Sequence, residues 1–263
     1  MSEIHPTAVI EDGAEIGKDV KIGPFVYISS RAAIGDNTVI GSHAVIEGRT
    51  TIGKDNQIFS HAVIGSIPQD LKYRGEDVEL IIGNSNKIRE FTLINPGTEG
   101  GGGVTRIGNS NLLMGYVHIG HDVQMGDNCI LANGATLAGH VELGDFVVIG
   151  GLTPVHQFVH IGEFAMIAGA SALSQDIPPY CLAEGNRAII RGLNLVGLRR
   201  HINREEIDEL KVIYKRLFES GRPLHDSARE ILEESISERG KKLLEFIIYS
   251  KRGIPFIRKN IDG

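Results

Sequence analysis

The chain has 263 residues and a formal net charge of −6, with 27 Lys and Arg against 33 Asp and Glu. This acidic balance argues against a dedicated nucleic-acid-binding protein, and the lack of an apolar run near the roughly 18 residues of a membrane helix argues against stable membrane insertion. Two cysteines and an N-terminus without a basic or apolar leader argue against a disulfide-stapled secreted scaffold and favour a cytoplasmic protein.

An aliphatic residue or Met recurs every six residues from the N-terminus onward. A small residue, often Gly, usually follows it, and a small or β-branched residue usually stands two positions before it. Side chains two apart lie on one face of a strand, and the small residue permits a tight corner, so the pattern predicts a solenoid of short strands. The repeated positions are Ile4, Ile10, Ile16, Ile22, Ile28, Ile34, Ile40, Ile46, Ile52, Ile58, Ile64, Ile82, Ile88, Ile94, Ile107, Leu113, Ile119, Met125, Leu131, Leu137, Leu143, Ile149, Val155, Ile161, Ile167 and Leu173.

This hexapeptide pattern resembles that of the left-handed parallel β-helix proteins, over about residues 4–180. The resemblance implies a mainly β fold in which three hexads form one triangular coil of about 18 residues. Because neighbouring coils pair as parallel strands, they should stack about 4.8 Å apart. We therefore expect a left-handed β-helix domain at residues 1–185.

Two segments interrupt the repeat. Asp70 and Glu76 occupy positions that the repeat would fill with apolar residues, so residues 66–80 should leave the solenoid as a loop. A second excursion is expected at residues 96–106, where the phase slips by one residue and Gly100–Gly103 predict a flexible segment that is not a phosphate loop. Long excursions from a rigid scaffold often carry function, and a tolerated surface insertion is the alternative.

The last third of the chain has a different pattern. Asn203 and Glu206 have the spacing of a capping box and precede an amphipathic stripe. Further apolar positions predict one or two more helices. We expect a C-terminal α-helical domain at residues 186–263, whose simplest role is to cover the open end of the solenoid.

Stacking of the coils predicts a cluster of polar side chains. Positions 18 apart lie above one another, so His121, Gly139 and Gln157 share one column, and Asp122 and His140 share the next. His121 is the best candidate for a general base, since an unperturbed imidazole titrates near neutral pH. Asp122 can hold its tautomer, and the Gly139 N–H can stabilise an oxyanion. The alternative is that these are only exposed side chains on a corner.

A metal site is another interpretation of these histidines. His118, His121 and His140 could offer three imidazoles to zinc, as in the γ-type carbonic anhydrases of the same fold. The paired histidines of that family are more widely spaced, and its acidic loop is not evident in this sequence, so we expect no metal. Cys129 occupies an inward position of the repeat, which indicates a core residue and not a nucleophile.

Several strings outside the simple repeat make the resemblance more specific. They are similar to those of the UDP-N-acetylglucosamine O-acyltransferases, the family that begins lipid A synthesis, and are not shared by hexapeptide acetyltransferases in general. The resemblance extends over essentially the whole chain, helical tail included. The strings are Gln69-Asp-Leu-Lys-Tyr73, Asn111-Leu-Leu-Met114, His118-Ile-Gly-His-Asp122, Asn128-Cys-Ile-Leu-Ala-Asn133, Ala135-Thr-Leu-Ala-Gly-His140, Val155-His-Gln-Phe158, Gln175-Asp-Ile-Pro-Pro179 and Gly185-Asn186.

The resemblance implies a reaction and its partners. His121 would deprotonate the group at the 3-position of the sugar, which then attacks the thioester of a hydroxyacyl chain on acyl carrier protein. Asp122 would orient His121, and the Gly139 N–H would bind the oxyanion. The acyl chain is carried on phosphopantetheine, so no diffusible cofactor or metal is expected. The partners implied are acyl carrier protein, a UDP-sugar and two further copies of the chain, in a homotrimer with sites between the prisms.

The resemblance also implies roles in substrate binding. Gln69, Asp70 and Lys72 would contact the acceptor or the acyl chain, and Gly169 stands where the family measures chain length. Contacts with the sugar, the nucleotide and the carrier phosphates are implied for His118, His140, His156, Gln157, Asn194, Arg199 and Arg200.

Departures from the family pattern leave the acceptor open. Val196, His201 and the segment 115–117 replace more polar or more basic residues, and a 3-amino sugar that yields an amide is the alternative acceptor. Gly169 leaves space and predicts a medium-to-long acyl chain. Three other interpretations are the related N-acyltransferase, which usually has an added N-terminal domain, an acetyl-CoA-dependent acetyltransferase, and a non-catalytic binding solenoid that would tolerate His121→Ala.

Overall fold

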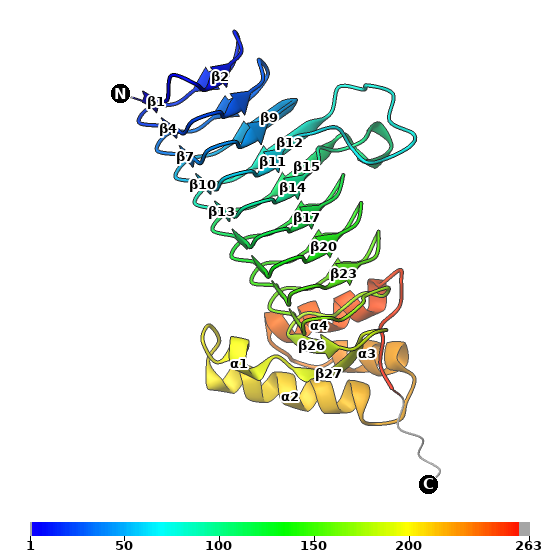
Figure 1. Ribbon diagram of the computed structural model, residues 1–263. Helices are drawn as coiled ribbons and strands as arrows, with labels where there is room; N and C mark the ends of the chain where they lie inside the picture. Colours follow the sequence, from blue (N-terminus) through cyan, green and yellow to red (C-terminus); the bar gives the residue numbers. More distant parts are fainter. Residues whose placement is uncertain (1, 258–263) are drawn as a thin grey trace.

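The computed structural model describes residues 2–257, which form a three-sided prism of stacked coils followed by helices (Figure 1). The prism is a left-handed parallel β-helix, as the family resemblance implied. Its strands form three sheets, named A, B and C. Sheet A contains β1 (Glu3–Ile4), β4 (Lys21–Ile22), β7 (Val39–Ile40), β10 (Gln57–Ile58), β13 (Lys87–Ile88), β16 (Leu112–Leu113), β19 (Ile130–Leu131), β22 (Val148–Ile149), β25 (Met166–Ile167), β26 (Cys181–Glu184) and β27 (Ile189–Leu193).

The other two sheets contain eight strands each. Sheet B contains β2 (Val9–Ile10), β5 (Tyr27–Ile28), β8 (Val45–Ile46), β11 (Val63–Ile64), β14 (Leu93–Ile94), β17 (His118–Ile119), β20 (Thr136–Leu137) and β23 (Pro154–Val155). Sheet C contains β3 (Glu15–Ile16), β6 (Ala33–Ile34), β9 (Arg49–Ile52), β12 (Glu79–Ile82), β15 (Val104–Ile107), β18 (Gln124–Met125), β21 (Glu142–Leu143) and β24 (His160–Ile161).

The register of the sheets follows the hexapeptide repeat. Ile4 pairs with Ile22, and Ile119 pairs with Leu137, so one coil takes 18 residues. Each chain passage from one sheet to the next makes a corner, and we name the corners A/B, B/C and C/A after the sheets that they join. Most corners hold one residue with a positive φ, for example His140 at 61°. The prism therefore repeats the same three corners in register, coil after coil.

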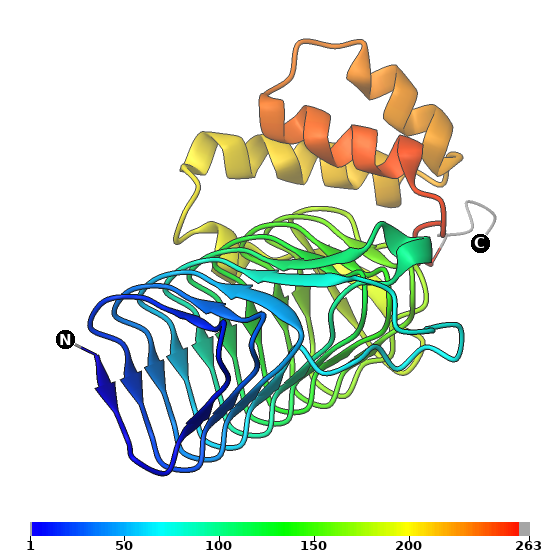
Figure 2. The same cartoon turned by 90° about the horizontal axis from the view of Figure 1, so that it is seen from above.

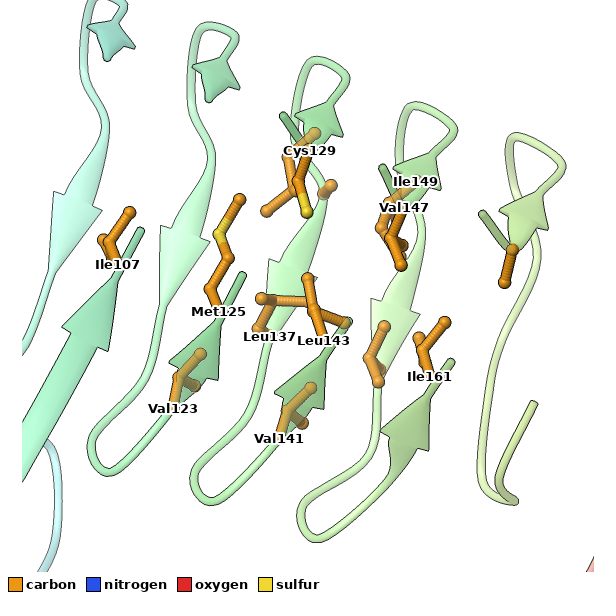
Figure 3. Close-up of a cluster of buried hydrophobic side chains, with 14 of the residues drawn as sticks. Ile107, Val123, Met125, Cys129, Leu137, Val141, Leu143, Val147, Ile149 and Ile161 are labelled. Carbon is orange, nitrogen blue, oxygen red and sulfur yellow. The ribbon is translucent and has the colours of Figure 1, made fainter. Parts of the chain in front are cut away.

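The repeated aliphatic side chains fill the inside of the prism. Figure 3 shows them meeting in layers between the three sheets. Ile119, Leu137 and Ile149 are fully buried, and each such side chain contributes about 1.5–3 kcal/mol relative to exposure. Cys129 is also fully buried in this core, as its inward position predicted. Ile4, in the first coil, is 48% exposed because no coil covers it.

Both interruptions of the repeat leave the prism at the B/C corner. Ile64 pairs with Ile94, 30 residues further on, and Ile94 pairs with Ile119, 25 residues further on. The extra residues project as the loop coloured cyan in Figures 1 and 2 and as a short turn that contains the 3₁₀ helix η1 (Glu99–Gly101). The paired strands keep their register on both sides, so the excursions do not disturb the coils.

The C-terminal part begins with a hairpin and continues as helices. Strand β26 pairs in parallel with β25 and antiparallel with β27, so the boundary proposed between residues 185 and 186 falls in the turn of this hairpin. Figure 2 shows the longer helices gathered on one side of the prism. The helices are α1 (Leu195–Leu198), α2 (Arg204–Phe218), α3 (Leu224–Leu232) and α4 (Glu238–Tyr249).

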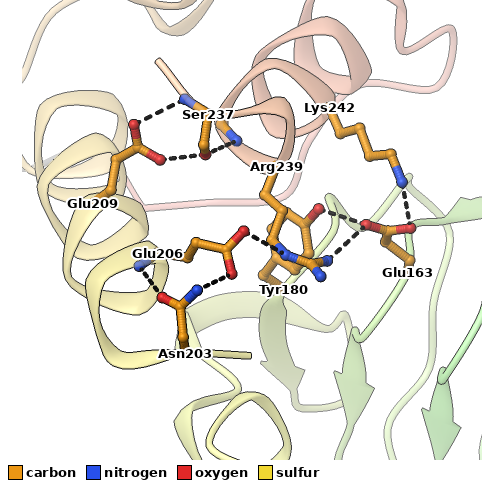
Figure 4. Close-up of polar contacts among 9 residues, drawn as sticks. Glu163, Tyr180, Asn203, Glu206, Glu209, Ser237, Arg239 and Lys242 are labelled. Carbon is orange, nitrogen blue, oxygen red and sulfur yellow. Dashed lines mark hydrogen bonds and ion pairs between the residues drawn. The ribbon is translucent and has the colours of Figure 1, made fainter. Parts of the chain in front are cut away.

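A polar network joins these helices to the last coils (Figure 4). Arg239 of α4 lies 3.2 Å from Glu206 of α2 and 3.7 Å from Glu163 of the prism. Glu163 also accepts hydrogen bonds from Tyr180 at 2.6 Å and from Lys242 at 2.8 Å. The α2 cap forms as predicted, since the Glu206 N–H donates to the Asn203 side chain at 2.9 Å. Among residues 2–257 there is no helix with the length and apolar character needed to cross a bilayer.

Candidate active site

The predicted polar cluster lies at the B/C corner, directly beside the two excursions. His121 and Asp122 follow β17 at this corner, and Gly139 and His140 follow β20 one coil later. The His140 N–H donates to the His121 carbonyl at 3.0 Å, which fixes the offset between the two coils. The columns predicted from the 18-residue spacing are therefore present in the structure.

His121 and Asp122 form a hydrogen-bonded dyad. Nδ1 of His121 lies 2.7 Å from Oδ2 of Asp122. Because an ionised carboxylate can only accept, this contact places the imidazole proton on Nδ1 and leaves the Nε2 lone pair free. The His121 side chain is 15% exposed and the Asp122 side chain 1% exposed. A mostly buried base held by a buried acid is suited to removing a proton from a substrate hydroxyl or amine.

Gly139 lies against the face of the His121 ring. A Cβ at this position would lie 2.5 Å from Cε1 and 2.6 Å from Nε2 of the ring, so only glycine fits beneath it. Within residues 2–257, the Gly139 N–H donates to no acceptor. An unpaired N–H beside the free nitrogen of a base is the arrangement that an oxyanion requires.

The second excursion covers Asp122. The Thr98 N–H donates to Oδ1 of Asp122 at 2.8 Å, and the Thr98 hydroxyl donates to Oδ2 at 2.6 Å. The Asp122 N–H in turn donates to the Thr105 hydroxyl at 2.8 Å. The glycine run at residues 100–103 was predicted to be a flexible excursion; its first part forms a 3₁₀ turn that packs on the carboxylate through Gly101. The hexad phase is lost before β15, so no spacing in the sequence indicated Thr98, whereas Thr105 stands in phase two residues before Ile107.

A cleft of about 530 Å³ lies beside the dyad, and it is lined by Thr98 and Gly101, which contact Asp122, and by His140, but not by His121 or Asp122. Asp70 and Lys72 of the first excursion line it opposite His140, and the Lys72 N–H, which donates to Asp70, lowers the pKa of that carboxyl. Burial lowers the pKa of His140, against the opposing charge of Asp122, so His140 is neutral near pH 7. The further lining residues, which sequence reasoning did not single out as site residues, are Tyr73, Glu76, Thr98, Glu99, Gly100, Gly101 and Phe158.

Four other predicted residues lie on the same side of the prism. His118 is half-buried on β17, burial lowers its pKa, and its Nδ1 has no hydrogen-bond partner among residues 2–257. His156 and Gln157 are exposed in the coil after His140, and His156 Nδ1 lies 3.3 Å from a guanidinium nitrogen of Arg252. Gln69 is exposed at the start of the first excursion, outside the residues that line the cleft.

The remaining predicted residues lie at other corners of the prism. Gly169 follows β25 at the A/B corner. Asn194 caps α1 and donates to the Phe164 carbonyl at 2.9 Å, at the C/A corner. Arg199 and Arg200 are exposed at the end of α1, next to His201, whose ring lies 4.9 Å from that of Phe146 at the C/A corner. One chain therefore does not bring these residues to its own dyad.

One group in the described part of the chain has the donors and spacing to hold a metal. It consists of His121, Asp122 and His140, whose ligand atoms lie within 4.8 Å of one another, and it does not include His118. However, Oδ2 of Asp122 already accepts from both the Thr98 hydroxyl and His121, so a metal would have to displace one of these hydrogen bonds. The donor set fits the hydrogen-bonded dyad better than a preformed metal site.

A wider groove of about 890 Å³ lies between the outer face of sheet C and α4. Arg106, Glu142 and His160 line it from the sheet, and Lys242 and Tyr249 line it from the helix. The groove contains none of the predicted site residues. The smaller cleft at the B/C corner is therefore the better candidate for chemistry, because Thr98 and Gly101, which contact Asp122, and His140, one coil beyond it, line that cleft.

Comparison with known proteins gives matches over the whole chain. Residues 176–255 match the family described as "Udp N-acetylglucosamine O-acyltransferase; Domain 2", and residues 13–48 and 104–139 match bacterial transferase hexapeptide repeats. The chain is 72% identical to the acyl-[acyl-carrier-protein]--UDP-N-acetylglucosamine O-acyltransferase of Sulfurovum sp. (strain NBC37-1), over 99% of this chain and 100% of the relative. It is 63% identical to the protein of the same name from Aliarcobacter butzleri, over 98% and 100% of the two chains.

Solved structures agree with these sequence matches. The structure of UDP-N-acetylglucosamine acyltransferase from Campylobacter jejuni superposes with a TM-score of 0.94 at 55% identity, covering 97% of this chain and 100% of that one. The Arabidopsis UDP-N-acetylglucosamine acyltransferase superposes with a TM-score of 0.83 at 38% identity, covering 96% and 99%.

Proposed function

Because this chain belongs to the UDP-N-acetylglucosamine O-acyltransferase family, we propose that it transfers a 3-hydroxyacyl chain from acyl carrier protein to the 3-position of UDP-N-acetylglucosamine, the first step of lipid A biosynthesis. The single observation that carries the proposal is the dyad: His121 held by Asp122 at 2.7 Å, with its Nε2 above Gly139 and beside the cleft. The buried, free Cys129 and Cys181 fit the reducing cytoplasm as the place of this reaction.

The chemistry follows from the positions of three groups. Nε2 of His121 takes the proton from the sugar 3-hydroxyl, and the oxygen attacks the thioester carbonyl carbon. The charge that develops on the carbonyl oxygen is met by the Gly139 N–H. When the intermediate collapses, the C–S bond breaks and His121 returns the proton to the phosphopantetheine thiolate. Asp122 stabilises the imidazolium between these two proton transfers. The thioester is already activated, so base, oxyanion donor and positioning suffice.

The substrates are proposed to lie between copies of the chain in a homotrimer. Asp70, Lys72, His140 and Gln157 are placed at the B/C corner of one prism, whereas Gly169 lies at the A/B corner and Arg199 with its neighbours at the C/A corner. A rigid prism cannot bring its own corners together, but a second prism can set another corner beside the dyad. Under this arrangement His118, His140, His156 and Gln157 hold the sugar, Arg199 and Arg200 meet phosphates, and the acyl chain passes Gly169.

The test is acyl transfer from 3-hydroxyacyl carrier proteins of several chain lengths to UDP-N-acetylglucosamine and to its 3-amino analogue. Ester formation that disappears in His121→Ala supports the proposal, and preferential amide formation would replace the acceptor while keeping the mechanism. Transfer to neither acceptor by a folded trimer would refute it and would favour acetyl transfer or simple binding instead.

A further inference from the structure

The turn that covers Asp122 is built unlike an ordinary helix start. Thr98 is the N-cap of η1, a position where a Thr hydroxyl usually accepts from an N–H of the first turn. Here the side chain makes no such bond. The hydroxyl instead donates to Oδ2 of Asp122, and the Thr98 N–H donates to Oδ1. Both donors of one residue are thus used on one carboxylate.

We infer that Thr98 is a positioning residue for the acyl transfer proposed above: it holds the Asp122 carboxylate in the one orientation that also bonds Nδ1 of His121. The inference rests on that proposed function. Without such donors, the terminal torsion angle of an aspartate side chain has a broad distribution, and the carboxylate can turn away from the imidazole. With one donor on each oxygen the plane of the carboxylate is fixed, and Oδ2 is shared between Thr98 and His121 at 2.6 and 2.7 Å.

Burial makes these two bonds difficult to replace. Asp122 is only 4% exposed and Thr98 8% exposed, so water does not reach the carboxylate from the side of the turn. Loss of a buried hydrogen-bond donor leaves a charged acceptor less firmly oriented than loss of an exposed donor would. The contact therefore influences the base through a path of two hydrogen bonds, from Thr98 to Asp122 and from Asp122 to His121.

The glycine run explains how the turn comes so close. A Cβ on Gly101 would lie 2.0 Å from Cγ of Asp122, which is far inside contact distance, whereas a Cβ on Gly100 would meet nothing within 4 Å. Gly102 and Gly103 have φ values of +97° and +80°, which side chains disfavour. The excursion at residues 96–106 is in this way shaped to seat Thr98 on the dyad.

The experiment compares Thr98→Val with Thr98→Ser in the full trimer. Val keeps the shape and the N–H but lacks the hydroxyl, so kcat should fall about 10- to 100-fold, as for one hydrogen bond to a charged group, while KM changes less than about threefold. Ser restores the hydroxyl and should recover kcat to within about threefold. Thr38→Val is the matched control, because it removes a buried hydroxyl far along the chain from the dyad and should leave kcat unchanged.

A second comparison separates action through Asp122 from a general effect on folding. In an Asp122→Asn background, Thr98→Val should have little further effect, because the carboxylate that it orients is already absent. Gly101→Ala should lower kcat like Thr98→Val, and Gly192→Ala, whose Cβ would meet nothing within 4 Å, should not. Additive losses in the double variant, or equal losses in Thr38→Val, would overturn the inference.

The same assays distinguish failure of this inference from failure of the proposed function. If the wild-type trimer transfers no acyl chain, the proposed function fails and the role of Thr98 fails with it. If transfer is lost in His121→Ala but proceeds at the wild-type rate in Thr98→Val, the proposed function stands and only the role of Thr98 is overturned.

Discussion

Replacing Gly139 by alanine tests the geometry of the base most directly. The new Cβ would lie 2.5 Å from Cε1, 2.6 Å from Nε2 and 3.0 Å from Nδ1 of His121, whereas ordinary contacts begin at 3.4 Å. The backbone of Gly139 does not have a positive φ, so alanine fits the main chain and only the imidazole has to move. Relief of the contacts takes the ring about 1 Å away from its place, a displacement of the size that costs about 100-fold in rate.

The expected result is a loss of about 100-fold in kcat, with a loss of folding stability of at most about 1–3 kcal/mol for overpacking beside the ring. The assay is steady-state acyl transfer, with the free energy of unfolding from denaturant titration measured on the same preparation. Gly192→Ala is the control, because its Cβ would meet nothing within 4 Å. An alanine variant with wild-type kcat would refute the placement of His121 over Gly139.

Three further predictions concern the fold. Burial raises the pKa of Glu163, but the hydrogen bonds from Lys242 and Tyr180 outweigh this effect and hold the pKa below the ordinary 4.5. The stabilisation is therefore complete above pH 4.5 and is lost as the pH falls through the lowered native pKa. The melting temperature should fall over this pH range in the wild type and should fall less in Glu163→Gln. Burial raises the pKa of Cys129 to about 12, so a thiol reagent at pH 8 should label the native protein about a thousandfold more slowly than the denatured chain, and rapid native labelling would contradict its place in the core. Ile88→Ala removes a fully buried side chain and should lower the free energy of unfolding by about 2–5 kcal/mol. A decrease of less than about 0.5 kcal/mol would contradict the prediction.

The prism was predictable because one aliphatic residue in every six marks its repeat in the sequence. Ile22, Ile40 and the repeated positions after them are buried where a six-residue phase places them, and the 18-residue pairing then fixes which corner side chains are neighbours. His121, Asp122 and Gly139 followed from this arithmetic without any knowledge of the loops. The reason is that a solenoid turns sequence distance into spatial distance by a constant rule.

The contacts that could not be predicted lie outside the repeat, where sequence distance no longer gives spatial distance. Thr98 reaches Asp122 from a part of the excursion in which no residue has a defined phase, so its two hydrogen bonds are tertiary contacts that spacing cannot indicate. The same limit applies to Arg199, because the path from the last coil through β27 to α1 depends on packing against Phe164 and not on a repeat. The roles of Arg199 and Gly169 in substrate binding remain predictions.

The register that continues across both excursions has a consequence for divergence. Ile64, Ile94 and Ile119 stay paired although 12 and 7 extra residues stand between their coils, so loop length at the B/C corner is independent of the frame that holds the dyad. Insertions and replacements can therefore accumulate in the cover of the cleft without moving His121 or Gly139. Evolution or design can therefore change what the cleft admits by altering these two surface segments, provided that Thr98 and Gly101 keep their contacts with Asp122.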